Sequence, residues 1–250
     1  MKRLLVPLLF FGFPIQVVAV SEELLIDPDQ LPAHVQSIEQ ENTRVQEHAQ
    51  AVFGEAKSLT KTMLEKQAQQ ISNPFFIEQL NETQVNNSKF AFGYKSEVYL
   101  GRWPLHYESK ETGINWSYQK VNENYVSPER IKYFQTDEVK VNGGIQSKIP
   151  GSEQIQQMVL QNVMERLSIP VSFEASFGAD TEKVLALNNN AGRETLEAYA
   201  GAVKEVGQVT YGEVFLTMNG RKQDLTIKNV VDEEITVWLP IPNRLAFHFK

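Results

Sequence analysis

The last part of the chain alternates apolar and polar residues so regularly that it constrains the fold more than any other segment. Apolar residues recur at every second position on both sides of Asn219-Gly220: Val214, Leu216, Met218, Leu225, Ile227 and Val231. A period of two places alternate side chains on opposite faces of a strand, and Asn-Gly is the dipeptide that suits a tight hairpin turn. The pattern predicts a β-hairpin at this turn, followed by strands at 235–239 and 245–249.

Three segments have the apolar spacing of helices, and we expect helices at 55–70, 152–167 and 192–206. The first is thinly apolar, which is typical of a helix packed on a surface. The second begins at Ser152, whose hydroxyl can cap the first turn, and ends before Pro170. Runs of strands with a few helices between them and no regular βαβ alternation predict an α+β fold on a mainly antiparallel sheet.

The amino-terminal segment, 1–19, has the anatomy of a secretory signal peptide: a basic start, an apolar run and a small-residue site at Ala19. Cleavage after Ala19 is favoured over a second site two residues later. Gly12 and Pro14 interrupt the run, which is short for a membrane-spanning helix, so we expect no transmembrane anchor after cleavage. The remaining chain is expected to be one mature domain outside the cytoplasmic membrane, secreted or otherwise extracytoplasmic. It would comprise a polar region at 20–87 with its surface helix and a sheet core at 88–250.

Cysteine content and charge exclude several classes of function. The chain has no cysteine, so disulfides, thiol catalysis, thiolate metal sites and a lipid anchor on cysteine are excluded. It has 24 basic and 31 acidic residues, and loss of Lys2 and Arg3 with the leader would change its net charge from −7 to −9. Such a balance argues against nucleic acid as a partner and against simple electrostatic binding to anionic wall polymers or lipids.

The chain lacks the local motifs of common catalytic and metal sites. None of its four histidines lies in an H-E-x-x-H or H-x-H arrangement. The densest acidic run, 232–234, is expected to be a solvated turn, because it lacks the alternating oxygen ligands and central glycine of a calcium loop. The S-x-x-K at 58–61 has no S-D-N or K-T-G partner downstream. We therefore expect no metal site and no cofactor, and these absences favour a protein that is not an enzyme.

Aromatic residues are concentrated between positions 88 and 125, which hold nine of the chain's 25. Rings that alternate along a strand suit the buried face of an antiparallel sheet. Trp103, however, precedes Pro104 at a predicted bend, where an amphipathic ring can stack on a sugar or a peptide. We take four residues as a candidate ligand-binding surface, with core packing as the competing interpretation: Arg102, Trp103, Tyr107 and Trp116.

The same stretch carries a resemblance to a known family. The run YLGRWPLHYESKET from Tyr99, followed by NWSYQKVN from Asn115, resembles the YfkD-like family of exported proteins from spore-forming Gram-positive bacteria. The run VQSIEQENT from Val35 is similar to the family's amino-terminal part. The resemblance extends over nearly the whole chain and implies an exported protein, but it assigns no catalytic set or ligand.

Two functional hypotheses follow from the sequence. The first is a non-enzymatic protein that binds a peptide, glycan or protein partner at the cell envelope through the aromatic stretch. The second is an envelope hydrolase whose carboxylates are dispersed in the sequence, which would require a close pair of carboxyl groups in a cleft. A purely structural envelope protein is a third alternative.

Overall fold

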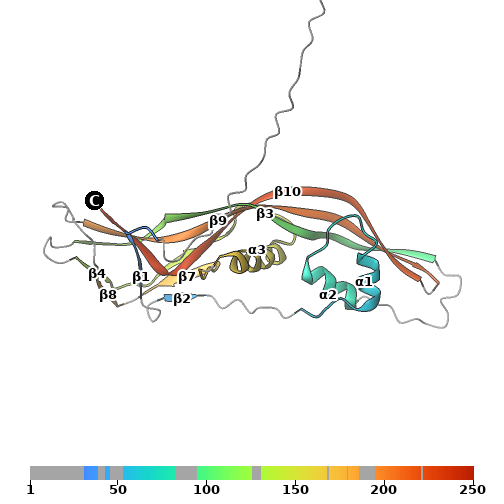
Figure 1. Ribbon diagram of the computed structural model, residues 1–250, viewed down its shortest axis with the longest axis horizontal. Helices are drawn as coiled ribbons and strands as arrows, with labels where there is room; N and C mark the ends of the chain where they lie inside the picture. Colours follow the sequence, from blue (N-terminus) through green and yellow to red (C-terminus); the bar gives the residue numbers. More distant parts are fainter. Residues whose placement is uncertain are drawn as a thin grey trace, which may run out of the picture.

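Three very long strands run along the molecule and give it an elongated shape (Figure 1). The computed structural model describes residues 31–38, 43–45, 53–82, 95–125, 131–167, 169–178, 180–185, 195–220 and 222–250. The predicted leader at 1–19 and the part of the aromatic stretch that precedes residue 95 lie outside these residues. The long strands are β3 (Lys95–Tyr125), β9 (Thr195–Asn219) and β10 (Lys222–Phe249). At a rise of about 3.3 Å per residue, β9 with its 25 residues spans roughly 80 Å, and β3 pairs along this whole length.

The main sheet is antiparallel throughout, with strand order β1-β10-β9-β3 and a short strand, β6, paired to β10. The two short strands are β1 (Val35–Ser37) and β6 (Gly144–Ile145). Two small antiparallel sheets lie at the end of the molecule where the carboxyl terminus is found (Figure 1). They are formed by β2 (Thr43–Val45), β7 (Glu174–Phe177) and β5 (Val139–Asn142), and by β4 (Lys132–Gln135) and β8 (Thr181–Val184). The predicted α+β class on a mainly antiparallel sheet is consistent with this architecture.

Three helices lie on one side of the long sheet in Figure 1: α1 (Ser58–Leu64), α2 (Pro74–Glu82) and α3 (Ser152–Arg166). The helix predicted at 152–167 is confirmed, although Gly151 and not Ser152 occupies its N-cap position. The helix predicted at 55–70 ends early, at Leu64. Helix α2 was not predicted, although its start has a local signal: Asn73 Oδ1 accepts a hydrogen bond from Phe75 N at 3.0 Å, and Pro74 occupies the first turn.

The helix predicted at 192–206 is wrong, because from Thr195 onward the chain is the central strand β9. The reason is that the buried side of β9 changes along its length. Even-numbered residues are buried up to Ala202, odd-numbered residues from Val203 to Tyr211, and even-numbered residues again at Val214. At the first change, Leu196, Ala200 and Val203 are buried with spacings of four and three, which imitates the apolar stripe of a helix.

The change of buried side divides the interior into three cores. The end core joins Leu196, Ala198 and Ala200 to the small sheets. The middle core packs α3 against Val203, Val209 and Tyr211, and the hairpin core packs α1 and α2 against Val214 and Leu216. Successive strand residues point to opposite faces, so the middle core lies on the other face of β9 from the two end cores. The twist of a long sheet allows the covering elements to lie on the same side in Figure 1.

Irregularities in β10 accompany each change of face. Its pairing with β9 shifts register between Lys228 and Val231 and between Pro240 and Leu245. Asn229 and Asn243 lie in these shifts with φ angles of 50° and 60°, a backbone region that asparagine tolerates. The two strands predicted at 235–239 and 245–249 are therefore parts of one long strand, and the acidic run at 232–234 lies within it and not in a turn.

The predicted hairpin between β9 and β10 is confirmed, with its turn displaced by one residue. Asn219 pairs with Lys222, so the connection is 220–221, and Gly220 supplies a φ of 59°. By contrast, the turn dipeptide Asn142-Gly143 does not form a hairpin, because β5 pairs with β7 whereas β6 pairs with β10.

A substitution at the first change of face tests this packing. A Cβ atom at Gly201 would lie 2.6 Å from Cε3 of Trp116, whose ring packs against the middle core. We expect Gly201→Ala to lower the free energy of unfolding by about 1–3 kcal/mol in chemical denaturation, because the indole must move. Gly113→Ala, where a Cβ atom meets nothing within 4 Å, should change it by less than about 0.5 kcal/mol. Equal effects at the two glycines would contradict this packing.

Candidate functional site

The structure places Arg102 and Trp103 side by side in β3 but in different surroundings. The Arg102 guanidinium is 2.6 Å from Glu233 Oε1 and lies 4.7 Å from the centre of the Tyr211 ring. Trp103 is half-buried in the hairpin core, where its ring centre is 5.4 Å from that of Phe76 and its Nε1 donates to Leu100 O. No bend occurs at Trp103, because β3 passes through this position with only a register shift after Pro104.

Tyr107 and Trp116 pack against the middle core. Tyr107 is buried, with 6% of its surface exposed, and Trp116 is half-buried against the same cluster. Of the four candidate residues, Arg102 is the most open, with a side chain 40% exposed. The four therefore do not form one continuous surface, and ligand binding by all of them together stays a prediction.

A fully buried carboxylate organises the region around Tyr107. Glu205 lies in the centre of β9 with 0% exposure, and it accepts hydrogen bonds from three side chains. Tyr107 Oη donates at 2.9 Å, Thr112 Oγ1 at 2.6 Å and the Arg166 guanidinium at 2.7 Å. Burying a carboxylate without partners is very unfavourable, so these contacts hold β3, β9 and the last turn of α3 together.

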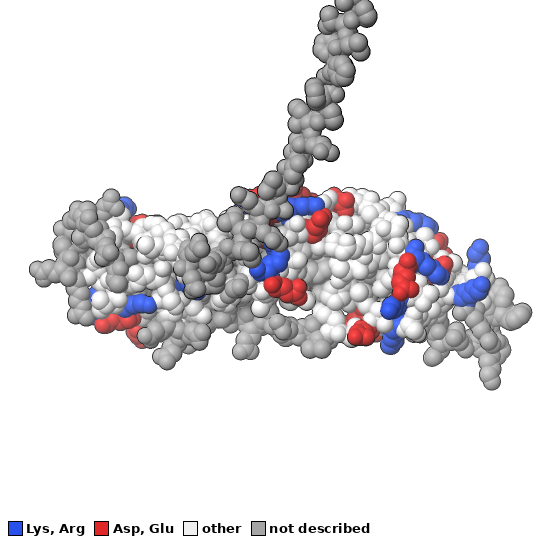
Figure 2. Space-filling model, viewed as in Figure 1, with Lys and Arg blue, Asp and Glu red and all other residues white. Residues whose placement is uncertain are grey.

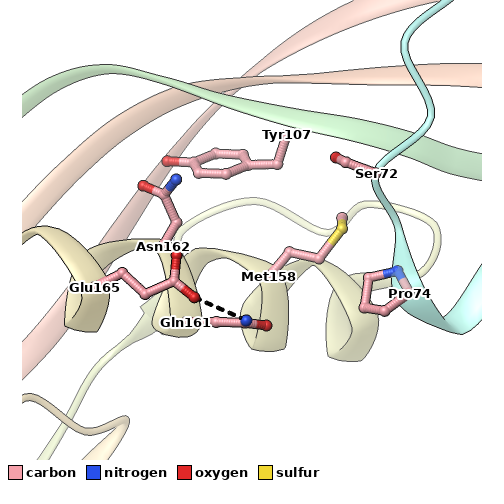
Figure 3. A pocket seen from close by; sticks show the side chains of 7 residues that line it. All are labelled: Ser72, Pro74, Tyr107, Met158, Gln161, Asn162 and Glu165. Carbon is pink, nitrogen blue, oxygen red and sulfur yellow. Dashed lines mark hydrogen bonds between the residues drawn. The ribbon is translucent and has the colours of Figure 1, made fainter. Parts of the chain in front are cut away.

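A pocket of about 160 Å³ opens beside this network, between β3, α3 and the segment that leads into α2. Figure 3 shows the Tyr107 ring above α3, with Met158 and Asn162 below it and Pro74 at the far end. The residues that line the pocket are Ser72, Pro74, Tyr107, Met158, Gln161, Asn162 and Glu165. A volume this far below the 300–1,000 Å³ of a typical ligand pocket suits one side chain or one ring of a larger partner.

The polar side chains of the pocket are held in place before any ligand arrives. Arg166 Nε donates to Asn162 Oδ1 at 2.9 Å, which turns the Asn162 amide nitrogen away from the guanidinium. Gln161 Nε2 donates to Glu165 Oε1 at 2.9 Å (Figure 3). Fixed rotamers lower the entropy lost on binding, so this pocket is better prepared to bind than an open surface would be.

The Tyr107 hydroxyl remains a hydrogen-bond donor because its environment disfavours the phenolate. Burial raises the pKa of Tyr107, and the negative charge of Glu205 raises it further. The neutral phenol can therefore donate to the carboxylate throughout the ordinary pH range. The ring is fixed at both ends, by the strand backbone and by this hydrogen bond.

The neighbouring Ser72 and His106 side chains do not complete a nucleophilic site. Ser72 Oγ and His106 Nδ1 are 2.7 Å apart, as in a serine–histidine pair. Within the described part of the chain, no carboxylate hydrogen-bonds to His106, whereas an activated nucleophile needs a base that a third group orients. Over the same residues, no three His, Cys, Asp or Glu side chains gather to hold a metal ion.

Sequence reasoning found Tyr107 but missed Glu205, Arg166 and the pocket. Glu205 falls within the helix expected at 192–206, where a carboxylate is usually solvated, and its partners Tyr107 and Arg166 are 98 and 39 residues away. No local spacing identifies such a set. The alternation of β9, had it been recognised, would have placed Glu205 on the buried side with Val203 and Val209.

Comparison with known proteins identifies the family. The family model described as YfkD-like protein matches residues 32–250. The chain belongs to the YfkD-like family. A relative, "Uncharacterized protein YfkD" of Bacillus subtilis (strain 168), is 34% identical over 263 residues, which cover 100% of this chain and 97% of that protein. No solved structure matches this YfkD-like chain.

The family assignment confirms the resemblance carried by the run that begins at Tyr99. That run forms much of β3, including Tyr107 and the strand segment above the pocket. Among the helices that the structure describes, none has the length and apolar character needed to cross a bilayer.

Alkaline unfolding tests the buried tyrosine in this YfkD-like chain. The pKa of Tyr211 is raised to about 12, chiefly by burial, and that of Tyr107 is raised further by burial and by Glu205. Each of these tyrosines has a higher pKa in the folded chain than in the unfolded chain. Its contribution to stability is therefore fully present below about pH 10 and is lost as the pH rises further. The free energy of unfolding should fall by about 1.4 kcal/mol per pH unit for each such tyrosine between roughly pH 10 and 12.

Tyr107→Phe should make this slope shallower by up to about 1.4 kcal/mol per pH unit, measured by urea denaturation at each pH. Tyr125→Phe is the control, because Tyr125 is 87% exposed and its loss should leave the slope unchanged. An unchanged slope in Tyr107→Phe would show that Tyr107 ionises equally in the folded and unfolded chains.

Proposed function

We propose that this YfkD-like protein is exported and acts outside the cytoplasmic membrane as a non-enzymatic binding protein for a peptide, glycan or protein of the cell envelope. The leader anatomy of 1–19 supports export. The observation that carries the binding role is the pocket beside the Glu205 network, whose lining side chains are held in position by hydrogen bonds. Its size suits a projecting group of a larger partner.

Surface charge favours recognition through this pocket over recognition through a broad electrostatic field. Lysine, arginine, aspartate and glutamate side chains are interspersed on the face shown in Figure 2, with uncharged surface between them. Mixed charges of this kind produce no strong single-sign potential to attract a polymer. A small preorganised pocket can still discriminate between partners by the group that enters it.

The lining of the pocket also favours binding over carboxylate-based hydrolysis. Glycoside hydrolysis uses two carboxyl groups on opposite sides of the scissile bond, and Glu165 is the one carboxylate among the residues that line this pocket. The nearby Glu205 is bound by an arginine, a tyrosine and a threonine. A carboxylate held in this way is a structural counter-ion and not a general acid.

Cell fractionation and cosedimentation test the proposal. The native protein should be found outside the cytoplasm, and chain 20–250 should sediment with purified cell wall or with membranes. Gln161→Trp should abolish this retention, because the indole would enter the pocket from an exposed position on α3. Glu153→Trp adds the same ring to the exposed surface of the same helix outside the pocket lining and should leave retention unchanged.

A cytoplasmic location would contradict the proposal, and so would the absence of retention on both wall and membranes. Equal loss of retention in the two tryptophan variants would show that the pocket is not the binding surface. Circular dichroism of each variant confirms that it has folded before sedimentation is compared.

A further inference from the structure

We propose that the pocket binds a primary ammonium group at the end of an alkyl chain, as in a lysine-type side chain of an envelope peptide. This inference rests on the proposed function and names the ligand chemistry of the same site. It follows from the charge, the aromatic wall and the apolar lining of the pocket.

The charge of the lining favours a cation. Glu165 is the one ionised group among the lining residues, and Gln161 engages one of its two oxygens. The nearby Arg166 offers no competing positive charge of comparable strength, because its donors contact Glu205, Thr112 and Asn162. A carboxylate at an exposed rim attracts an ammonium group.

The aromatic wall favours a cation as well. Tyr107 donates its hydroxyl hydrogen to the Glu205 carboxylate, and this contact makes the ring more electron-rich. The face of a tyrosine ring attracts a cation that lies within about 6 Å of its centre. Because Tyr107 is buried except where it borders the pocket, an ammonium group that approaches the ring does so from the pocket.

The apolar part of the lining matches an alkyl chain. Met158, Pro74 and the Tyr107 ring line the space between the polar groups (Figure 3). A lysine stem packs favourably along apolar surface while its ammonium group reaches a polar site, and methionine adapts its shape to such a stem. The hydroxyl groups of a neutral sugar can donate hydrogen bonds to Glu165 but form no ion pair with it, so the lining fits a lysine side chain better than a glycan ring.

Titration with small probes tests this inference on chain 20–250. Nα-acetyl-lysine amide should shift the NMR signals of pocket residues with a dissociation constant on the order of 1 mM, as expected for one side chain in a small open site. Binding should weaken as the salt concentration rises. Nε-acetylation of the probe, which removes the charge and keeps the stem, should abolish the shifts.

Glu165→Gln should weaken binding of the lysine probe about threefold, the effect of one exposed ion pair. Glu153→Gln, on the first turn of the same helix and outside the pocket lining, should leave binding unchanged. Both side chains are exposed, so neither variant is expected to disturb folding.

Three outcomes would overturn the inference: equal binding of the Nε-acetylated probe, equal affinities of the two glutamine variants, or tighter binding of uncharged N-acetylglucosamine oligomers than of the lysine probe. Its failure is distinguishable from failure of the proposed function. Retention on wall that Gln161→Trp abolishes, without lysine binding, would keep the envelope role and reject the ammonium ligand. Lysine binding without retention would support the ammonium ligand and reject the envelope role.

Discussion

A carboxylate buried at the centre of the sheet is the constraint on which the middle of this molecule depends. Glu205 is accommodated in the interior because Tyr107, Thr112 and Arg166 all donate hydrogen bonds to its carboxyl group. These partners come from β3 and from the last turn of α3, so satisfying one charge sets the position of the helix against the sheet. The same contacts hold the Tyr107 ring and, through Arg166, the Asn162 amide. The pocket is therefore a consequence of the way the charge is buried.

The long sheet creates a second constraint, because one strand must bury different sides along its length. Each of the three cores has its own cover: the small sheets, α3, or α1 with α2. Positive φ angles at Asn229 and Asn243 let β10 change register where β9 changes its buried side. Strand β3 has five such shifts against β9. In the part of the chain that the structure describes, no strand pairs with the outer edge of β3. Bulges and charged residues on an outer strand discourage pairing with another chain.

The combination of rigidity and openness at the pocket is what suits it to binding. Its floor and aromatic wall belong to the middle core, whereas Gln161 and Glu165 are exposed on α3. Rigid walls limit the entropy lost on association, and exposed rim groups keep the electrostatic contribution modest and sensitive to salt. Specificity in such a site comes from the group that enters it, and affinity for a large partner requires further contact outside it.

The sequence alone determined the features that depend on neighbouring residues: the antiparallel α+β class, the hairpin near Asn219-Gly220, and the helix at 152–167. Each follows from local backbone preference and side-chain period, which act within a few residues. Tertiary structure decided the rest. Whether the residues between Ala200 and Val203 form a helix or a strand depends on which face each neighbouring layer covers, and this made the predicted helix at 192–206 wrong. The site also depends on distant partners, because Glu205 is stabilised by Tyr107, which is 98 residues away in the chain. Burial of that charge became possible only when three separate segments met.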